Sequence, residues 1–370
     1  MQAALILEQA LGPVPGGTGR YSIELARALA AGAPEGSSVT GWTAWHRDAA
    51  AAEVPGVRGP KTLPLARRPL TLAWERRVGP VPRGADVVHA PTLLMPPRRG
   101  TPLVVTIHDA VPWTHPDTLT PRGVRWHRAM AEYAARVADR IIVPTHAVAE
   151  DLRAVLPLDD RVRVIGHGVT ELTPGDGVTE LRPDESAAGL ELPAEGYLMT
   201  LATLEPRKGL DTLIAALADP AAPKLPLLIV GQPGWGGVDP VAEAARQGID
   251  ADRIRVLGRI DDALLARVLR QAMMLVMPSR AEGFGLPLVE AMAAGTAVVH
   301  SDAPALVEVG GGAGRVVPRD SPRLLAEALR EVAEDETLRA QLVAAGRKHA
   351  EQYTWSAVAE AVWGLYAALR

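Results

Sequence analysis

Short runs of apolar residues alternate with longer stretches of helical periodicity along the whole chain. Buried strands of a parallel sheet appear as short apolar runs, and amphipathic helices repeat apolar residues every three or four positions. The alternation therefore predicts parallel sheets flanked by helices, an α/β architecture. In the first half the predicted strands are Leu5–Leu7, Asp86–His89, Leu103–Ile107, Arg140–Pro144 and Arg161–Ile165, and the predicted helices are Arg20–Ala31 and Arg122–Arg140.

A segment without periodicity divides the chain near its middle. Residues 173–195 are rich in Pro, Gly, Asp and Glu, so we interpret them as a linker. The alternating pattern then starts again, which predicts two α/β domains of similar size, residues 1–180 and 190–354. In the second half the predicted strands are Tyr197–Ala202, Leu225–Val230, Arg253–Leu257 and Met274–Met277, and the predicted helices are Gly209–Leu217, Asp262–Ala272 and one that begins near Pro287.

Composition excludes several classes of protein. No apolar stretch reaches the roughly 18–20 residues of a membrane-spanning helix. The apolar residues 1–12 lack the basic start and the cleavage pattern of a signal peptide, so they are interpreted as a first buried strand. The absence of cysteine excludes a disulfide framework, a thiolate metal site and a cysteine nucleophile. An isoelectric point near 6.2 argues against a nucleic-acid partner.

The candidate chemistry gathers in residues 278–292. A predicted buried strand ends at Met277, a glycine-bearing loop follows, and a helix begins soon after. The amides of Gly283–Leu286, together with the helix dipole, would form an anion site that a diphosphate can approach closely. Glu282 in the loop and Glu290 in the helix would repel a bare phosphate, whereas both suit a ligand that carries hydroxyl groups. The pattern therefore indicates a nucleotide-sugar.

This segment resembles the Glu-x7-Glu motif of the family 4 retaining glycosyltransferases, which have the GT-B fold. The resemblance is carried by Glu282, Glu290, the Gly-Phe-Gly-Leu-Pro sequence between them and the similar segment Ala293–Val299. The order of the other segments extends it over nearly the whole chain. It implies two Rossmann-like domains that face each other across a cleft, with a C-terminal helix, residues 355–370, that crosses back onto the first domain.

The resemblance also implies roles for individual residues. Glu290 would bond the ribose hydroxyls of the donor, while Glu282 and His108, which ends a strand in an Ile-His-Asp sequence, would contact the donor sugar. Arg207 and Lys208, in the sequence Glu-Pro-Arg-Lys-Gly, look like a clamp that neutralises the departing diphosphate. The remaining implied donor contacts are Gly16 and Gly17 in a glycine-rich loop, Gly283, Phe284, Gly285 and Leu286 at the sugar and diphosphate, and Gly258, Arg259 and Ile260 at the nucleobase.

The phosphate clamp departs from the family at one place. Many members carry a Gly-Arg pair just after the preceding strand, where this chain has Ala202 and Thr203. A subset of the family has the Pro-Arg-Lys sequence, which suggests that Arg207 takes over the role of the missing arginine. The role of Lys208 is the firmer of the two.

The implied function is a retaining, metal-independent glycosyltransferase that moves a hexose from a nucleoside-diphosphate sugar to an acceptor hydroxyl, with no cofactor beyond this co-substrate. The motifs look most like those of mannosyltransferases, which implies GDP-mannose, and a UDP-hexose stays open. Same-face attack is preferred because no nucleophile stands out, and double displacement stays open. A nucleotide-sugar epimerase or hydrolase on the same scaffold and a nucleotide-sugar binder without turnover are the alternatives. The acceptor is a sugar, a lipid-linked sugar or a small molecule.

Charged segments carry three further expectations. Asp250-Ala251-Asp252 has the spacing of a metal-binding pair but lies in a loop before a strand, so no metal site is expected. The segment Arg58–Arg83 is strongly basic and would attract phosphate-bearing ligands or an anionic membrane surface, although a solvated face is the preferred interpretation. The basic helix Arg122–Arg140 carries Trp126 and Tyr133, and the resemblance leaves open a peripheral contact with the inner face of the membrane, although a solvated helix is the preferred interpretation. The expected location is otherwise the cytoplasm.

Overall fold

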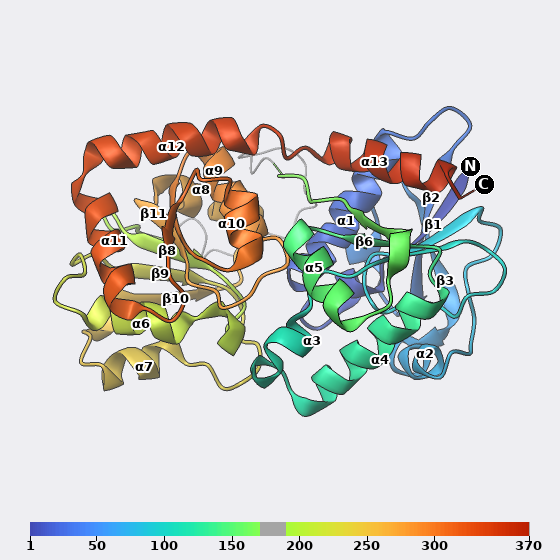
Figure 1. The fold of residues 1–370 in the computed structure, drawn as a ribbon, viewed down its shortest axis with the longest axis horizontal. Coiled ribbons are helices and arrows are strands. Elements are labelled where there is room, and N and C mark those ends of the chain that lie inside the picture. The colour runs from blue at the N-terminus through green and yellow to red at the C-terminus, as the bar shows by residue number, and fades with distance from the viewer. Residues whose placement is uncertain (171–189, 370) are drawn as a thin grey trace. The chain divides into compact units, whose positions relative to one another are not determined.

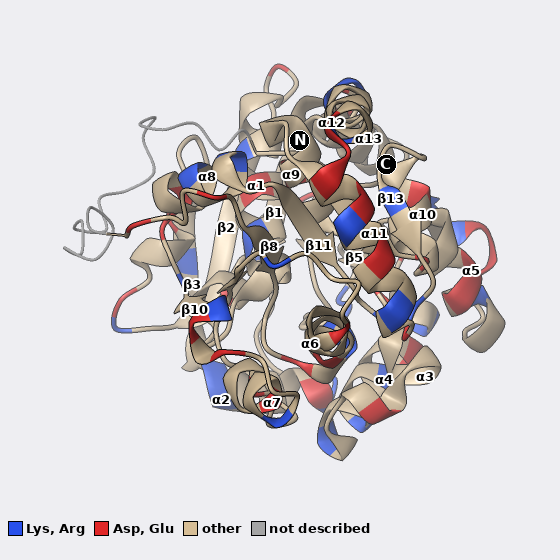
Figure 2. Cartoon of the chain, turned by 90° about the vertical axis from the view of Figure 1, so that its left-hand side faces the viewer, with Lys and Arg blue, Asp and Glu red and all other residues tan. Residues whose placement is uncertain are grey.

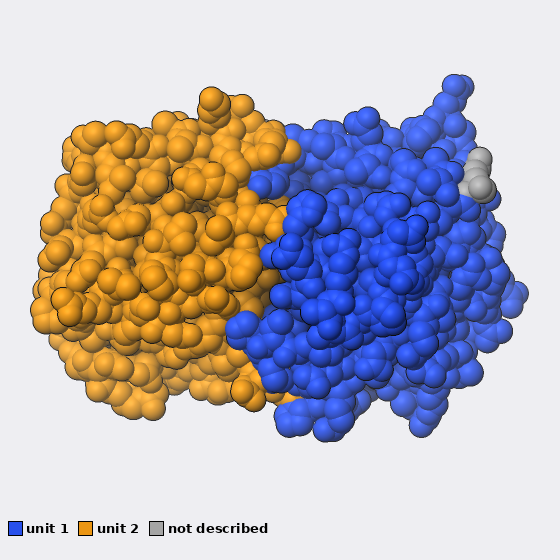
Figure 3. Space-filling model, viewed as in Figure 1, with its two compact units in different colours: residues 1–116, 121–168, 353–370 blue, residues 117–120, 169–352 orange. Residues whose placement is uncertain are grey.

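The computed structural model describes residues 1–170 and 190–369, and the chain divides into two compact units (Figure 1, Figure 3). Unit 1 consists of Met1–Pro116, Pro121–Gly168 and Tyr353–Arg370, and unit 2 consists of Asp117–Thr120 and Val169–Gln352. The predicted linker, residues 173–195, lies outside the described residues as far as residue 189. Each unit has its own parallel sheet, as the alternating pattern predicts.

Unit 1 is built on a seven-stranded parallel sheet with the order β3-β2-β1-β4-β5-β6-β7. The strands are β1 (Gln2–Ile6), β2 (Ser38–Trp45), β3 (Arg58–Ala66), β4 (Val87–Ala90), β5 (Leu103–Thr106), β6 (Arg140–Val143) and β7 (Val162–Val164). The predicted strands are confirmed as β1 and β4 to β7, although β1 begins earlier than expected. The strand order reverses between β1 and β4, the kind of switch point at which open α/β sheets bind ligands.

The sequence pattern does not predict β2 and β3, and burial explains why. In β2 the buried positions include Gly41 and Thr43, so apolar and polar residues do not alternate clearly. A Cβ on Gly41 would lie 2.7 Å from Leu7 Cδ1, so close packing requires glycine at this position. In the edge strand β3 only Leu63 is buried. The basic segment Arg58–Arg83 therefore begins as an exposed edge strand.

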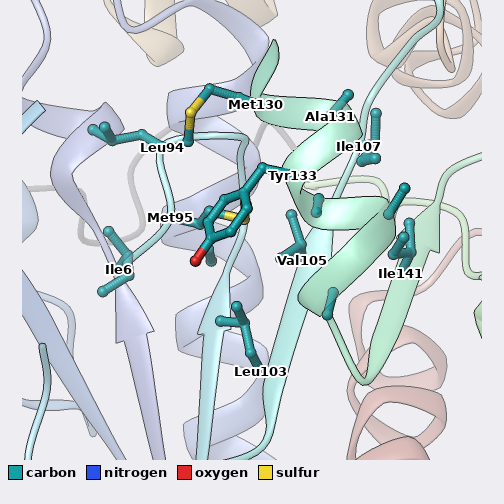
Figure 4. Packing of buried hydrophobic residues seen from close by; sticks show 14 of the residues in the cluster. Ile6, Leu94, Met95, Leu103, Val105, Ile107, Met130, Ala131, Tyr133 and Ile141 are labelled. Atoms are coloured by element: carbon teal, nitrogen blue, oxygen red, sulfur yellow. The ribbon is translucent and has the colours of Figure 1, made fainter. Parts of the chain in front are cut away.

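Helices cover both faces of this sheet. They are α1 (Gly16–Ala31), α2 (Arg67–Glu75), α3 (Val111–Thr114), α4 (Pro121–Val137), α5 (His146–Val155) and α13 (Trp355–Ala367). Successive strand residues point to opposite faces, so Ala4 and Ile6 pack in one cluster with α2, α4 and α5, while Ala3 and Leu5 pack in another with α1 and α13. Figure 4 shows the first cluster, in which Tyr133 of α4 lies over the strands.

The last helix of the chain packs on the first. Helix α13 contacts α1, and the indole nitrogen of Trp363 donates to the carbonyl of Leu29 over 3.0 Å. The apolar spacing of α13 places Val362 and Tyr366 in the same buried cluster. This confirms the implied return of the C-terminal helix to the first domain.

Unit 2 contains a six-stranded parallel sheet with the order β10-β9-β8-β11-β12-β13. Its strands are β8 (Leu198–Leu201), β9 (Leu227–Val230), β10 (Ile254–Gly258), β11 (Met274–Met277), β12 (Ala297–Ser301) and β13 (Arg315–Val317). Its helices are α6 (Leu210–Ala218), α7 (Pro240–Arg246), α8 (Asp262–Gln271), α9 (Leu286–Ala294), α10 (Pro304–Gly310), α11 (Pro322–Glu334) and α12 (Glu336–Ala350). The predicted strands and helices of this half are confirmed as β8 to β11, α6, α8 and α9. The expected fold class, two Rossmann-like sheets, is thereby confirmed.

Acidic and basic residues alternate along α11 of unit 2 (Figure 2). Arg323 pairs with Glu327 one turn later, and Arg315 of β13 pairs with Glu331. Exposed pairs of this kind contribute little to stability, so they chiefly keep the surface solvated. Among the helices that the structure describes, none combines the length and apolar character needed to cross a membrane.

We expect Trp363→Ala to weaken unit 1 strongly. Trp363 is 5% exposed, and deleting a buried tryptophan side chain costs about 3–5 kcal/mol. The matched control is Trp45→Ala, because Trp45 is 58% exposed and its loss should cost under about 1 kcal/mol. Thermal unfolding followed by circular dichroism compares the two, and equal losses of stability would contradict the packing of α13 described above.

Candidate active site

Two loops of unit 2 meet at the switch point of its sheet. The strand order reverses between β8 and β11, so the loops that follow these strands, residues 202–209 and 278–285, begin at neighbouring strand ends. The first loop contains a short 3-10 turn, Pro206–Lys208. The amide of Arg280 in the second loop donates to the carbonyl of Arg207 over 2.8 Å, which joins the two loops.

Glu282 pairs with both basic residues of the expected clamp. Lys208 Nζ donates to Glu282 Oε1 over 2.7 Å, and Arg207 Nη1 donates to Oε2 over 2.9 Å. Ser279 Oγ donates to Oε1 over 2.7 Å. The Glu282 side chain is only 7% exposed, so these charge-assisted bonds replace the bonds to water that burial removes. The fold thus brings Arg207 and Lys208 to a carboxylate 74 residues beyond Lys208.

These contacts keep the Glu282 carboxylate ionised. Burial alone would raise the pKa of Glu282, but the charges of Lys208 and Arg207, with the bonds from Lys208 and Ser279, outweigh it and lower the pKa to about 2. Glu282 is therefore a permanent anion beside two cations at any physiological pH.

The guanidinium of Arg207 lies between two carboxylates. Nε and Nη2 donate to Glu205 Oε1 over 3.1 and 2.7 Å, and Nη1 also donates to the carbonyl of Ala281 over 2.8 Å. With Glu205 buried on one side and Glu282 on the other, two cations and two carboxylates balance in charge. Sequence reasoning missed Glu205, although the Glu-Pro-Arg-Lys-Gly sequence that drew attention to Arg207 contains it.

Arg280 supports the same two loops and was also missed. Its guanidinium donates to Asp211 over 3.0 and 2.7 Å, to Asp320 over 2.7 Å and to the carbonyl of Pro206 over 2.7 Å. These bonds hold the 3-10 turn that carries the clamp against the second loop. The signal in the sequence was the position of Arg280 three residues after a buried strand, in the loop that carries Glu282.

Glycine is required where these loops approach each other. Gly209 has a φ of +65°, and a Cβ there would lie 2.3 Å from the carbonyl oxygen of Pro278. Gly285 has a φ of +92°, and a Cβ there would lie 2.5 Å from Leu306 Cδ2. Gly209 allows the turn that carries Arg207 and Lys208 to pack against the second loop, and Gly285 allows the chain to turn into α9.

The expected donor contacts of unit 2 lie at the ends of its elements. Helix α9 begins at Leu286, so the amides of Gly283–Leu286 lie at its N-terminus, and Glu290 lies one turn further with 3% of its surface exposed. Gly258 ends β10, its carbonyl accepts from the amide of Gly231 over 2.9 Å, and Arg259 and Ile260 follow. All are placed at the carboxyl edge of the sheet, and their contacts with a donor stay predictions.

The glycine-rich segment of unit 1 differs from expectation. Helix α1 begins at Gly16, four residues before the expected start at Arg20, so Gly16 and Gly17 form its first turn and not a separate loop. The physical reason is that Pro15 already has helical dihedral angles and its carbonyl accepts from the amide of Gly19 over 3.0 Å. The space around the α-carbons of Gly16 and Gly17 is open, which leaves their expected role as ligand contacts a prediction.

His108 lies in unit 1, directly after β5 and Ile107. Its Nε2 lies 2.7 Å from the carbonyl oxygen of Pro91, and its ring is edge-on to Tyr21, with ring centroids 4.8 Å apart. Burial lowers the pKa of His108, and the bond to Pro91 and the charge of Asp109 only partly oppose this. Asp109 also accepts from the amide of Val111 over 3.1 Å, in the turn that follows.

Two family models match almost all of the chain. The model described as "Glycosyltransferase Family 4" matches residues 15–171, and the one described as "Glycosyl transferases group 1" matches residues 183–349. The chain belongs to family 4 of the glycosyltransferases.

Relatives and solved structures agree with this assignment. A "Phosphatidyl-myo-inositol mannosyltransferase" of Mycolicibacterium smegmatis is 43% identical over 167 residues, which are 44% of this chain and 42% of the relative. A "D-inositol 3-phosphate glycosyltransferase" of Segniliparus rotundus is 33% identical over 75% of this chain and 63% of the relative. The aligned part therefore spans less than half of the first relative. The structure of a sucrose-phosphate synthase from Thermosynechococcus elongatus superposes with a TM-score of 0.74 at 24% identity, covering 100% of this chain and 99% of that one, which shows the GT-B fold.

We expect the Glu282→Gln variant of this family 4 member to lose stability in a pH-dependent way. The carboxylate has a pKa of about 2 in the folded protein and about 4.5 as a free side chain. Its contribution, about 3 kcal/mol for a shift of this size, is fully present above pH 4.5 and lost as the pH falls toward 2. The difference in unfolding free energy between the wild type and the variant should therefore shrink over this interval.

The matched control is Glu334→Gln, because Glu334 is exposed on α11 and should change stability by under about 0.5 kcal/mol. Thermal unfolding between pH 2 and 7 measures both variants. A Glu282→Gln difference that stays constant down to pH 2 would show that Lys208 and Arg207 do not hold the carboxylate ionised.

Proposed function

We propose that this chain transfers a hexose from a nucleoside-diphosphate sugar to an acceptor hydroxyl with retention of anomeric configuration, without a metal ion. The observation that carries the proposal is the cluster of Arg207, Lys208 and Glu282 beside the N-terminus of α9. A glycosyl transfer is slow because charge builds on the leaving diphosphate, and cations and backbone amides fixed in advance lower that barrier.

In the proposed reaction the bond between the anomeric carbon and the diphosphate oxygen breaks, and the same carbon forms a bond to the acceptor oxygen. The acceptor proton passes to the departing diphosphate, which leaves as the nucleoside diphosphate. This same-face course needs no protein nucleophile.

In this proposal the cationic residues and the carboxylates bind different parts of the donor. Lys208 and Arg207 supply positive charge to the diphosphate, and the amides of Gly283–Leu286 bond its oxygens. Glu282 holds both cations in place in the free protein, and a ligand hydroxyl can share the oxygens that they occupy. Glu290, buried one turn into α9, binds the ribose hydroxyls.

The donor that we propose is GDP-mannose. Its support is the 43% identity with a protein named as a mannosyltransferase, over 44% of this chain. A UDP-hexose is the second candidate, since the motifs around Glu282 and Glu290 do not include a side chain that distinguishes guanine from uracil. The acceptor binds unit 1, where His108 lies, and it is a sugar, a lipid-linked sugar or a small molecule.

We expect GDP-mannose to raise the melting temperature more than UDP-glucose, UDP-GlcNAc or dTDP-sugars do. A ligand at 100 times its dissociation constant stabilises the folded state by about 2.7 kcal/mol. Lys208→Met should weaken donor binding about tenfold to a hundredfold, the value of a bond between charged groups. Lys224→Met is the matched control, because Lys224 is exposed and one of only four lysines in the chain.

Radiolabelled donor then separates the remaining functions. Transfer to an acceptor supports the proposal, release of free mannose indicates a hydrolase, a changed sugar nucleotide indicates an epimerase, and binding without turnover indicates a binder. A larger shift with a UDP-sugar moves the assignment to a UDP-hexose. No shift with any nucleotide-sugar, or an equal shift for Lys208→Met and wild type, overturns the donor site.

A further inference from the structure

The ends of three neighbouring strands of unit 1 bring together a carboxylate, an imidazole and a guanidinium that the proposed reaction does not use. Glu8 lies two residues after β1, His46 directly follows β2, and Arg67 directly follows β3. The three strands are adjacent in the sheet, and β1 borders the point where the strand order reverses. The three side chains therefore lie at the carboxyl edge, where open α/β sheets bind ligands.

Glu8 is buried, and its carboxylate bonds to groups from the two neighbouring strands. Its side chain is 1% exposed. Oε2 accepts from the amide of Ala44 over 2.7 Å, and Arg67 Nη1 lies 3.3 Å from Oε1. Arg67 Nη1 also donates to the carbonyl of Glu8 over 2.8 Å, which holds the guanidinium on the turn after β1. The carboxylate is thus an internal group that acts on a ligand only through its neighbours.

The third partner of the carboxylate, His46, stays accessible. Its Nε2 lies 2.9 and 3.1 Å from the two carboxylate oxygens of Glu8, and its side chain is 19% exposed. A carboxylate beside a guanidinium only accepts, so a bond of this length requires a hydrogen on Nε2. Within residues 1–170 and 190–369, the structure gives Nδ1 of His46 no hydrogen-bond partner.

The pairing of Glu8 with Arg67 favours a neutral His46 ring. Arg67 already balances the charge of the carboxylate, and both Arg67 Nη1 and His46 Nε2 approach Oε1, so a second positive charge there would be repelled. A neutral ring with its hydrogen on Nε2 has a lone pair on Nδ1. A buried carboxylate that fixes the tautomer and orientation of a histidine prepares the other ring nitrogen to accept a hydrogen bond.

We propose that His46 accepts, through Nδ1, a hydrogen bond from a hydroxyl group of the substrate to which the sugar is transferred, and that Glu8 is its positioning residue. The inference rests on the proposed function, because it takes for granted that this substrate binds unit 1. It adds a recognition residue for that substrate and limits the chemical class to which the substrate belongs.

The hydroxyl bound by His46 is not the one that reacts. In the proposed reaction the proton of the reacting hydroxyl passes to the departing diphosphate, and a bond to Nδ1 would hold that proton elsewhere. The substrate therefore carries at least one further hydroxyl. It is a polyol, either a free sugar or the sugar of a lipid-linked compound, and an alcohol with a single hydroxyl does not fit.

The tautomer is tested first, by NMR of the full chain labelled with ¹⁵N in its nine histidines. The His46 signals are identified by their absence from the His46→Ala spectrum. At about pH 8 we expect the neutral Nε2–H form in the wild type. A protonated ring, or a hydrogen on Nδ1, overturns the proposal whether or not the chain transfers a sugar.

Glu8→Gln tests the positioning role with the same signals. Glutamine can donate to Nε2 as well as accept from it, so we expect a mixture of the two tautomers. Glu53→Gln is the matched control, because Glu53 is exposed and should leave the wild-type tautomer unchanged. A pure Nε2–H signal in folded Glu8→Gln overturns the role of Glu8.

The ligand class is tested by titrating the labelled protein with methyl α-D-mannopyranoside, which carries several hydroxyls, and with cyclohexanol, which carries one. Both titrations are made with and without GDP. We expect the mannoside to shift the Nδ1 resonance of His46 and cyclohexanol to leave it unchanged. No shift with the mannoside in either condition, an equal shift with cyclohexanol, or an equal shift of His127 on α4 overturns the proposal.

Kinetics then separate recognition from a part in the chemical step. With GDP-mannose as donor, we expect His46→Ala to raise KM for the mannoside at least about tenfold, the value of one hydrogen bond, and to leave kcat within about twofold. His127→Ala is the matched control, because His127 is half-buried like His46 but lies on α4. A fall in kcat with unchanged KM overturns the recognition role. Wild type that binds the mannoside at His46 but transfers from no nucleotide-sugar refutes the proposed function alone.

Discussion

The organisation of unit 2 around its switch point depends on one buried carboxylate. Glu282 has lost nearly all contact with water, and an ionised carboxylate can be buried only when opposite charges and hydrogen bonds replace the water. Lys208, Arg207 and Ser279 provide them, so the loop after β8 and the loop after β11 must meet. Gly209 and Arg280 make that meeting possible, the first by having no side chain and the second by bonding both loops. A buried cluster of two cations and two carboxylates, Lys208, Arg207, Glu282 and Glu205, is therefore already assembled at the carboxyl edge of the sheet.

Unit 1 presents chemistry of the opposite kind. Its candidate residue, His108, lies among neutral rings, and burial keeps those rings neutral. The two units therefore differ in the electrostatics of their candidate residues, which are charged and paired in unit 2 and uncharged and packed against one another in unit 1. Helix α13 contributes to this second environment through Tyr366, whose hydroxyl lies 2.7 Å from His89 Nδ1.

The limits of sequence reasoning can be seen in particular elements. The strands β1 and β4 to β6 were predicted because apolar residues occupy most positions on both of their faces. Such a run can be recognised in the sequence without knowing which strands lie beside it. The strands β2 and β3 were not, because one buries a glycine under Leu7 and the other is an exposed edge. The start of α1 was placed too late because glycines usually mark a loop, whereas here the helix begins at Gly16, directly after Pro15, and Gly19 packs against Pro15.

The sequence by itself determined the α/β class, the family and the identity of the residues that carry the expected chemistry. Those conclusions depend on local information: apolar periodicity, turn residues and the spacing of Glu282 and Glu290 along one loop and helix. Only the tertiary structure decided which groups satisfy one another. The structure shows Glu205 and Arg280 as partners of the loop that carries Arg207 and Lys208, and Pro91 as the partner of His108. Hydrogen bonds join atoms that are close in space, and the distance between residues along the chain does not determine which atoms these are.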